Sequence, residues 1–119
     1  MGRRDRRYDG GPEFPLEKVR ACIAVSQFAL SRKAEYTDGP RILPGGTIDV
    51  FGTVKGLVSE LREDDWKFAQ EMNGRWVDVY RVNYEGRDVW LKLKVELWQH
   101  AKEHAVVISF HEWDDDRPI

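Results

Sequence analysis

The sequence predicts an α+β domain in which N-terminal helices pack on one face of a small antiparallel sheet. Apolar residues recur every three or four positions in the first half of the chain and alternate with polar residues in the second half. The chain has 119 residues, of which 41% are hydrophobic and 12% aromatic. That length and composition suit a single folded domain with one core.

The two ends of the chain are predicted to be tails. Residues 1–14 contain four arginines but no apolar periodicity, which indicates a flexible, Arg-rich arm. Such an arm could touch nucleic acid, although a solvated terminus is the simpler interpretation. Residues 114–119 begin with three aspartates and are predicted to form an acidic tail. The domain itself is expected to span residues 15–113.

The first helix is expected to begin at Pro15, because proline suits the first helical position. It should end near residues 31–33. Residues 37–46 contain two prolines and three glycines, which indicates a loop. The apolar stripe of the helix is formed by Leu16, Val19, Ile23 and Leu30.

Two further helices are expected before the strands begin. Thr47 is a good N-cap residue for a helix whose buried face includes Val54. Another helix is predicted over residues 62–72, because three acidic residues stand in its first turn, where they stabilise the helix dipole. The dipeptide Asn73-Gly74 is expected to end it.

Three antiparallel strands are expected over residues 76–84, 87–97 and 105–111. Glu85-Gly86 separates the first two and indicates a hairpin turn. A polar link over residues 99–104 precedes the third strand.

Alternation assigns the residues of these strands to the two faces of the sheet. In the middle strand the core face is expected to hold Val89, Leu91, Leu93, Val95 and Leu97. The other face then holds Trp90, Lys92, Lys94 and Glu96. In the third strand the two faces are expected to be Val106, Ile108 and Phe110 against Val107, Ser109 and His111. The polar face is the expected location of a functional site.

The hairpin register decides which residues share that face. A two-residue turn places Arg81 opposite Trp90, on the face of the lysines. A three-residue loop instead places Tyr80 opposite Trp90 and Asp78 opposite Lys92. A slip of one residue exchanges the two faces of a strand. We favour the two-residue turn.

Charge and cysteine content exclude several classes of protein. The 19 Lys and Arg nearly balance the 21 Asp and Glu, so nucleic-acid binding requires a local basic site. Cys22 is the only cysteine, which excludes an internal disulfide or a Cys-based zinc site and fits a reducing cytoplasm. No apolar run approaches the ~20 residues that cross a bilayer. The N-terminus has no apolar segment typical of a secretory signal.

The sequence carries none of the common catalytic motifs: no glycine-rich dinucleotide or phosphate loop, no zinc-protease motif and no serine-hydrolase elbow. His100 and His104 have the spacing of helical metal ligands, but they fall in the polar link and no third ligand is evident. No metal or cofactor is therefore expected. Cys22 is expected to be a core thiol rather than a nucleophile.

The polar face of the strands is suited to RNA chemistry. A histidine such as His111 has an ordinary pKa near ~6.5 and transfers protons at neutral pH. Trp90, placed beside lysines, would stack on an unpaired base while the cations hold phosphates. Taken alone, each residue has a simpler interpretation as a surface histidine or an interface tryptophan. Their combination on one face favours the RNA hypothesis.

The stretch WVDVYRVNYEGRDVWLKLKV, followed by AVVISFHEW, resembles the motility quorum-sensing regulator (MqsR) family of bacterial toxins. Family members have a W-x-D-V-Y-R strand, a G…V-Y-L-K strand and a closing V-S-F strand. Here the corresponding motifs begin at Trp76 and Gly86 and close at Ser109 and Phe110. The resemblance covers roughly residues 57–113. It implies the RelE-like fold and an mRNA interferase of a type II toxin–antitoxin system.

Several positions depart from the family's pattern. Trp90 stands where the family has a functional tyrosine, and His111 stands where it has a lysine. Val77 replaces a glutamine. Phe68 aligns with a helix lysine of the family, and Lys67 lies one position away.

The resemblance also implies a mechanism and the residues that serve it. The 2′-hydroxyl of the RNA attacks the adjacent phosphate, which needs proton transfer and charge stabilisation but no metal or cofactor. The implied catalytic residues are His111 as acid or base, Arg81 and Lys92 as phosphate stabilisers, and Lys67 in a supporting role. The implied RNA-binding residues are Trp90, Lys94 and Tyr80.

The implied partners are an mRNA substrate and a cognate antitoxin protein, with operator DNA bound only through the antitoxin. The expected location is the cytoplasm, without contact to a membrane. The alternative is a catalytically altered, toxin-like domain that binds RNA or a protein partner without cleavage. A third hypothesis is a protein-interaction domain that uses Trp66, Trp98 and Trp113.

Overall fold

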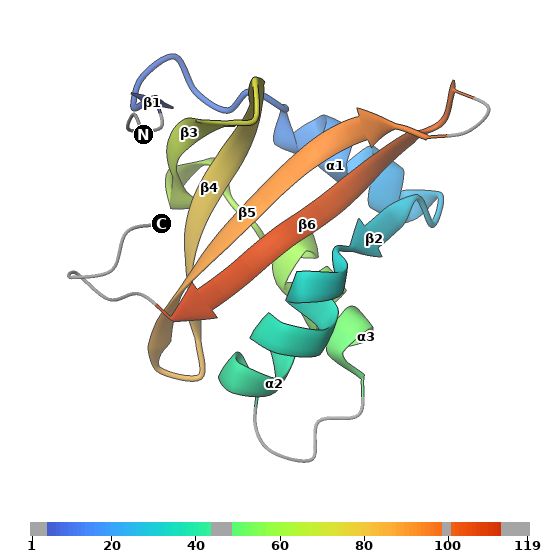
Figure 1. The fold of residues 1–119 in the computed structure, drawn as a ribbon, viewed down its shortest axis with the longest axis vertical. Coiled ribbons are helices and arrows are strands. Elements are labelled where there is room, and N and C mark those ends of the chain that lie inside the picture. The colour runs from blue at the N-terminus through green and yellow to red at the C-terminus, as the bar shows by residue number, and fades with distance from the viewer. Residues whose placement is uncertain (1–4, 44–48, 99–100, 113–119) are drawn as a thin grey trace.

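The centre of the protein is a six-stranded mixed sheet (Figure 1) with strand order β1-β3-β4-β5-β6-β2. The computed structural model describes residues 5–43, 49–98 and 101–112. The strands are β1 (Arg6–Arg7), β2 (Phe28–Leu30), β3 (Trp66–Met72), β4 (Arg75–Tyr84), β5 (Arg87–Leu97) and β6 (Glu103–Glu112). The helical segments are α1 (Leu16–Ala24), the π-helical η1 (Ala34–Asp38), α2 (Gly39–Ile42), α3 (Val50–Ser59) and the 3-10 turn η2 (Glu63–Asp65).

The predicted fold class is wrong. The sheet is mixed rather than antiparallel, because β2 runs parallel to β6, and it has six strands. Two of them, β1 and β2, come from segments predicted to be a tail and a helix. Strands of two and three residues leave no periodic pattern in the sequence, so pairing with β3 and β6 decides their conformation. The chain is strand-rich with short helices, and the expected RelE-like arrangement is overturned with the fold class.

The helix predicted over residues 62–72 is also wrong. After the short turn η2, residues 66–72 form β3, which pairs antiparallel with β4. Asn73 and Gly74 have φ angles of 54° and 80°, as a two-residue hairpin turn requires. The residues of β3 include good helix formers, but pairing with β4 overrides their intrinsic propensity. The Asn-Gly dipeptide signalled a hairpin rather than a helix end.

The predicted first helix is shorter than expected. α1 ends at Ala24, and Ser26 has a φ of 60°, which a continuing right-handed helix does not accommodate. Leu30, predicted on the helix stripe, lies in β2 instead. Part of the predicted loop, residues 39–42, is the short helix α2, and residues 44–46 lie outside the described residues.

The helix expected after the loop is present as α3. Its N-cap is Asp49, whose carboxylate accepts a hydrogen bond from the Gly52 amide at 2.7 Å. The predicted cap, Thr47, lies outside the described residues. Val54 is fully buried, as predicted.

The predicted hairpin between β4 and β5 is confirmed. Tyr84 pairs with Arg87 across the two-residue turn Glu85-Gly86, whose φ angles of 50° and 83° are those of a tight hairpin turn. This is the favoured register. The core face of β5 is confirmed from Val89 to Val95, whereas Leu97 is exposed.

The two faces of β6 do not follow the predicted alternation. Lys92 of β5 pairs with Ser109, but the next residue, Leu93, pairs with Val107, so a β-bulge lies at Ile108. An inserted residue reverses the alternation on one side of a bulge. Val107 and Phe110 therefore both lie in the core, while Ser109 keeps the predicted outward position.

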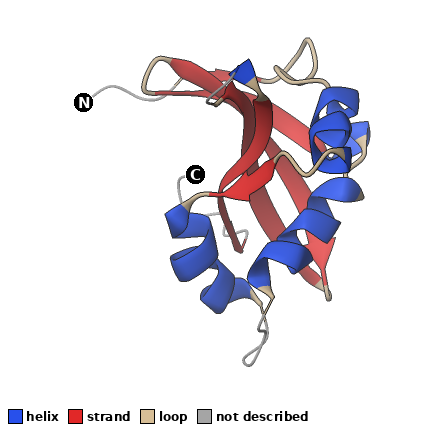
Figure 2. Ribbon diagram, turned by 90° about the vertical axis from the view of Figure 1, so that its right-hand side faces the viewer, coloured by secondary structure: helices blue, strands red, loops and turns tan. Residues whose placement is uncertain are grey.

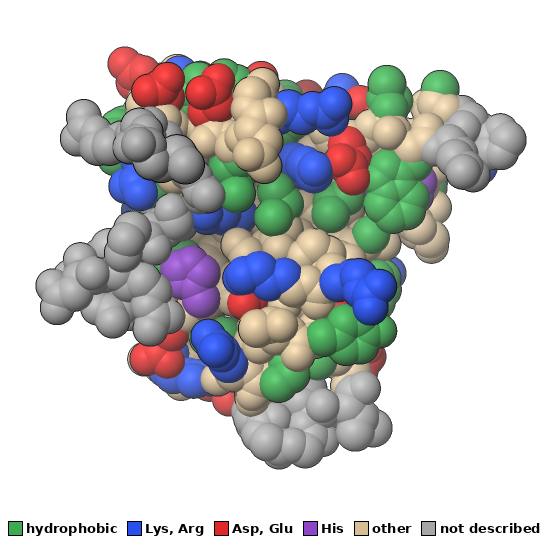
Figure 3. All heavy atoms as spheres, viewed as in Figure 1, with side chains coloured by type: hydrophobic (Ala, Val, Ile, Leu, Met, Phe, Trp, Pro, Cys, Tyr) green, Lys and Arg blue, Asp and Glu red, His purple; other side chains and the backbone are tan. Residues whose placement is uncertain are grey.

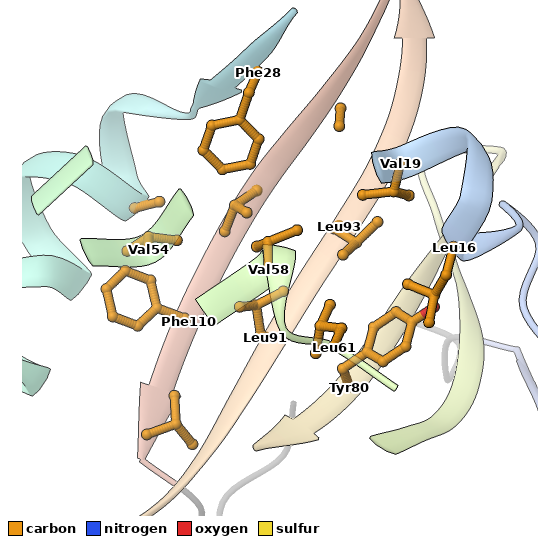
Figure 4. Packing of buried hydrophobic residues seen from close by; sticks show 14 of the residues in the cluster. Leu16, Val19, Phe28, Val54, Val58, Leu61, Tyr80, Leu91, Leu93 and Phe110 are labelled. Carbon is orange, nitrogen blue, oxygen red and sulfur yellow. The ribbon is translucent and has the colours of Figure 1, made fainter. Parts of the chain in front are cut away.

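The main core lies between the sheet and the helices α1 and α3, which cover the same face of it (Figures 1 and 2). η1 and α2 contact β6. No helix among the described residues is long and apolar enough to cross a membrane. Figure 4 shows how the side chains of α1 and α3 meet those of the central strands; among the labelled residues are Leu16, Val19, Val54, Val58, Tyr80, Leu91, Leu93 and Phe110.

The core contains one polar atom whose removal should stabilise the protein. Tyr80 is 0% exposed, and within the described residues its hydroxyl has no hydrogen-bond partner. Because a buried unsatisfied hydroxyl costs about 1–3 kcal/mol, Tyr80→Phe should raise the free energy of unfolding by about 1 kcal/mol. Urea denaturation of both proteins measures the difference. A loss of stability would mean that the hydroxyl has a partner in solution.

The expected N-terminal arm is attached to the sheet over its described residues. β1 pairs antiparallel with β3, and the Glu71 amide donates to the Asp5 carbonyl at 2.9 Å. Farther along, the carboxylate of Asp78 accepts hydrogen bonds from the amides of Glu13 and Phe14 at 2.8 and 2.9 Å. Burial raises the pKa of Asp78, and these hydrogen bonds act against that rise. Asp78 therefore holds the N-terminal segment on the helix side of the sheet.

Candidate RNA-binding face

The face of the sheet opposite α1 and α3 carries the residues predicted to form a site. Strand pairing and alternation define this outer face. Its members are Arg6, Ala29, Phe68, Gln70, Met72, Arg75, Val77, Val79, Arg81, Asn83, Asp88, Trp90, Lys92, Lys94, Glu96, His104, Val106, Ser109 and His111.

The outer face is basic although the chain has a net charge of −2. Its strands hold five Lys or Arg residues against two carboxylates, counted on the described residues of the face. Figure 3 shows Lys and Arg side chains spread over the side of the molecule seen in Figure 1, with a histidine beside them. The local basic site that the balanced composition requires is therefore present on this face.

Three site residues lie in one row across the sheet. Arg81 of β4 pairs with Trp90 of β5, and Trp90 pairs with His111 of β6. Because neighbouring strands are about 4.8 Å apart, the row spans about 10 Å. Lys92 lies one step along on the same face, opposite Ser109. The predicted convergence of Arg81, Trp90, Lys92 and His111 is confirmed at the level of register.

His111 is half-buried, and its surroundings lower its pKa and so favour the neutral imidazole. Burial is the main cause that lowers its pKa below the ordinary value, and the charges of Lys92 and Lys33 lower it further. The Glu112 carbonyl and the carboxylate of Asp38 act in the opposite direction. At pH 7 the ring is therefore predominantly neutral, the form that accepts a proton.

The hydrogen bond of the imidazole ring indicates its tautomer. His111 Nδ1 lies 3.3 Å from the Glu112 carbonyl oxygen, which only accepts hydrogen bonds. In the neutral ring, Nδ1 then carries the hydrogen and Nε2 carries the lone pair. Nε2 is the atom that would take a proton from a substrate hydroxyl.

Removing the charge of Lys92 should raise the pKa of His111. Lys92→Met keeps an unbranched side chain but removes the cation that disfavours protonation of the imidazole. Titration of the His111 ring by NMR measures the shift, and Lys18→Met on α1 is the matched control. An unchanged His111 titration in Lys92→Met would show that the two side chains do not interact.

The depressed pKa of His111 also predicts how stability depends on pH. Since the unfolded chain binds a proton at His111 more readily, stability is lost as the pH falls through the unfolded value of about 6.5 towards the lower folded value. In His111→Gln this contribution to the pH dependence of the unfolding free energy should disappear. Urea denaturation at several pH values below 7 tests it.

The β-bulge that positions His111 is held from outside the sheet. At the bulge the Ile108 carbonyl accepts a hydrogen bond from the Ser31 hydroxyl at 2.5 Å. The Phe110 amide donates to the carboxylate of Asp38 at 3.0 Å. Ser31 precedes η1 and Asp38 is its last residue, so this segment pairs with backbone groups of β6 at and beside the bulge. We call Ser31 and Asp38 the bulge clamp.

Lys33 forms an ion pair with the clamp residue Asp38. Its ammonium lies 2.8 Å from the carboxylate of Asp38, which is itself 3% exposed. The sequence pattern predicts no site role for Ser31, Lys33 or Asp38, because it puts Ser31 and Lys33 at a helix end and Asp38 in a loop. The available signal was local: Ser31 is a good N-cap residue, and its hydroxyl accepts from the Ala34 amide at 3.0 Å.

Arg81, the β4 member of the row, forms an ion pair with Asp88 of β5. Its guanidinium lies 2.5 Å from the carboxylate of Asp88, and both side chains are more than one-third exposed. Water and salt reach this pair, so the attraction is weak and a phosphate can compete for the guanidinium. Arg81 is thus an accessible cation of the row.

Trp90 and Lys92 are less accessible than predicted. Their exposed fractions are 6% and 5%, so neither is the surface side chain that alternation alone suggests. Trp90 contacts Phe68, with ring centroids 5.9 Å apart, and with Val79 the two rings form a second apolar cluster. The interpretation of Trp90 as an open stacking platform is not supported by this geometry.

The remaining predicted residues are dispersed. Tyr80 lies in the core on the helix side of the sheet, so it is not part of the outer face. Lys67 is exposed at the β-bulge of β3, between Trp66 and Phe68, and among the described residues it has no pairing partner in the register that would place it in the row. Lys94 lies on the outer face and forms an ion pair with Glu96 at 2.7 Å.

The other residues considered from sequence are two histidines and the cysteine. Among the described residues no three His, Cys, Asp or Glu side chains are grouped to hold a metal ion. His104 stacks on Trp98 at 4.0 Å, and His100 lies outside the described residues. Cys22 is buried, its Sγ lies 3.6 Å from the Glu103 carbonyl, and burial raises its pKa, which disfavours the reactive thiolate.

Comparison with known proteins adds no assignment. No protein-family model matches the chain, and no curated protein matches its sequence.

Proposed function

We propose that the outer face binds single-stranded RNA and cleaves it without a metal, as an endoribonuclease. The observation that carries the proposal is the row of Arg81, Trp90 and His111 across three strands, with Lys92 beside it. It combines a neutral histidine with cations on one face of the sheet. These are the groups that RNA cleavage by proton transfer and phosphate stabilisation requires.

In the proposed reaction the RNA supplies its own nucleophile. His111 Nε2 takes the proton of a 2′-hydroxyl, and the 2′-oxygen attacks the adjacent phosphorus. The bond from phosphorus to the 5′-oxygen breaks, and the leaving oxygen takes a proton from water or from the imidazolium. The products are a 2′,3′-cyclic phosphate and a 5′-hydroxyl. Arg81 and Lys92 stabilise the charge on the phosphate oxygens.

The biological setting is proposed from the sequence resemblance. The protein is a toxin of a type II toxin–antitoxin system that acts on mRNA in the cytoplasm. A cognate antitoxin protein is its partner, and operator DNA is bound only through the antitoxin. Growth arrest on expression, relieved by a co-expressed neighbouring gene, is the expected behaviour in cells.

The second candidate function is binding of RNA or of a protein partner without cleavage. The observation that favours it is the burial of Trp90 and Lys92, which limits how closely a phosphate approaches the row. The two candidates share one surface and differ in chemistry.

Incubation of a mixed-sequence RNA with the purified protein in EDTA tests the proposal. Cleavage that leaves 2′,3′-cyclic phosphate and 5′-hydroxyl ends, and that is lost when the 2′-hydroxyls are methylated, supports the ribonuclease. Binding of the same RNA without cleavage, with and without ribosomes, supports the second candidate. Failure to bind RNA at all contradicts both RNA functions.

A further inference from the structure

A chain of three aromatic rings runs from the row to the edge of the outer face. The Trp90 and Phe68 rings lie 5.9 Å apart, and the Phe68 and Tyr8 rings lie 5.3 Å apart. Trp90 is 6% exposed and Phe68 is 3% exposed, whereas Tyr8 is 63% exposed. The accessible end of this aromatic chain is therefore Tyr8.

A cation packs on the same Phe68 ring that Tyr8 contacts. The Arg6 guanidinium lies 4.6 Å from the centre of the Phe68 ring, at cation–π distance. Arg6 is exposed and pairs with Gln70 on the outer face. An exposed aromatic ring and an exposed guanidinium thus both lie against Phe68, an arrangement that suits the alternation of base and phosphate in a nucleic-acid strand.

The segment that carries Tyr8 is anchored before any ligand binds. The guanidinium of Arg7, on the opposite face, donates to the carbonyls of Asp9 and Gly11 at 2.8 and 2.9 Å. It also forms an ion pair with Glu13 at 3.1 Å. Asp78 then holds the chain beyond this point through the two backbone amides described above. A preordered segment loses little conformational freedom when a ligand binds.

We infer that Tyr8, rather than Trp90, is the side chain on which an unpaired RNA base stacks, and that Arg6 contacts a neighbouring phosphate. The inference rests on the proposed function, because it assigns the far end of the same RNA-binding face. Phe68 contacts the Tyr8 ring, and Trp90 contacts Phe68 in turn. The RNA then extends from the row at β4–β6 across β3 to the N-terminal segment.

This geometry favours single-stranded RNA as the substrate class. Stacking on Tyr8 needs a base whose face is free, whereas bases in a duplex are stacked on one another. The A-form duplex also presents its phosphates and 2′-hydroxyls rather than base faces to a protein. A duplex of the same sequence should therefore bind more weakly, and loss of Tyr8 should affect it little.

Fluorescence anisotropy with a labelled, mixed-sequence 2′-O-methyl RNA measures binding without cleavage. Tyr8→Ala should weaken binding of the single strand about 5- to 150-fold, the range for loss of one stacked base. Tyr36→Ala removes an equally exposed tyrosine, 68% exposed on η1, and should bind as the wild type does. Tyr8→Trp should retain binding because it keeps an aromatic face. Arg6→Gln should weaken binding. It should also reduce the slope of the logarithm of the binding constant against the logarithm of salt concentration by about 1, as expected for the loss of one phosphate contact.

The outcomes separate the inference from the proposed function. If the wild type binds the single strand and Tyr8→Ala binds equally well, the stacking assignment is wrong while the RNA-binding face stands. If Tyr8→Leu, which keeps apolar bulk against Phe68, binds as tightly as the wild type, stacking is likewise overturned. If the wild type does not bind the single strand, the proposed function and the inference both fail. Thermal unfolding of each variant confirms that the N-terminal segment remains attached.

Discussion

His111→Ala should lower the rate of RNA cleavage by about 10²–10⁴-fold while the protein remains folded. The imidazole is the proposed proton acceptor, and a positioned acid–base group contributes that factor to a rate. Its lowered pKa keeps it in the neutral form at pH 7, so cleavage by the wild type should rise with pH through the pKa of His111 and then level off. Single-turnover cleavage of a mixed-sequence RNA in EDTA measures both effects.

His104→Ala is the matched control for this experiment. It removes a histidine from the same strand, where His104 stacks on Trp98 instead of lying in the row. Its cleavage rate and pH profile should be those of the wild type. Equal cleavage by folded His111→Ala and wild type would remove His111 from the mechanism. Binding of 2′-O-methyl RNA by His111→Ala, unchanged from the wild type, would assign the loss to chemistry rather than affinity.

The parts of the fold that the sequence predicted are those with strong local signals. The alternation from Val89 to Val95 and the Glu85-Gly86 turn predicted β4, β5 and their register. That register is why Arg81 and Trp90 could be placed together before the structure was seen. Two periodic strands joined by a tight turn leave little freedom in their pairing.

The parts that failed depend on contacts between distant segments. β2 exists because residues 28–30 pair with β6, some eighty residues later, and β1 exists because Arg6 and Arg7 pair with β3. β3 itself includes several residues that favour a helix in isolation. No local pattern reports these pairings, so the fold class derived from periodicity was wrong.

The sequence predicted which site residues share one face of the sheet, but not how deeply their side chains are buried. His111 was placed on the correct face although the alternation of β6 is broken, because the bulge lies before Ser109. Alternation does not predict the burial of Trp90 and Lys92. It assigns each residue to one face of the sheet but does not indicate which other residues cover that face. The clamp residues Ser31, just after β2, and Asp38, at the end of η1, bond to β6 through contacts that no spacing in the sequence encodes.

Asp38→Ala should destabilise the protein and disable the site together. The substitution leaves the buried Phe110 amide without its acceptor, a loss of about 1–3 kcal/mol in the free energy of unfolding. It also frees the bulge that sets the position of His111, and a shift of about 1 Å in a catalytic group costs about 10²-fold in rate. Urea denaturation and single-turnover cleavage measure the two effects. Asp64→Ala, at an exposed carboxylate on η2, is the matched control.

Asp38→Asn separates the structural role of the side chain from its charge. The amide oxygen still accepts a hydrogen bond from Phe110, so the stability should stay close to that of the wild type. The negative charge that raises the pKa of His111 is lost, so that pKa should fall further and the rise of cleavage with pH should begin at a lower pH. If Asp38→Ala matches the wild type in stability and cleavage, the bulge does not depend on the clamp. If Asp38→Asn leaves the titration of His111 unchanged, the carboxylate acts on His111 through backbone geometry alone.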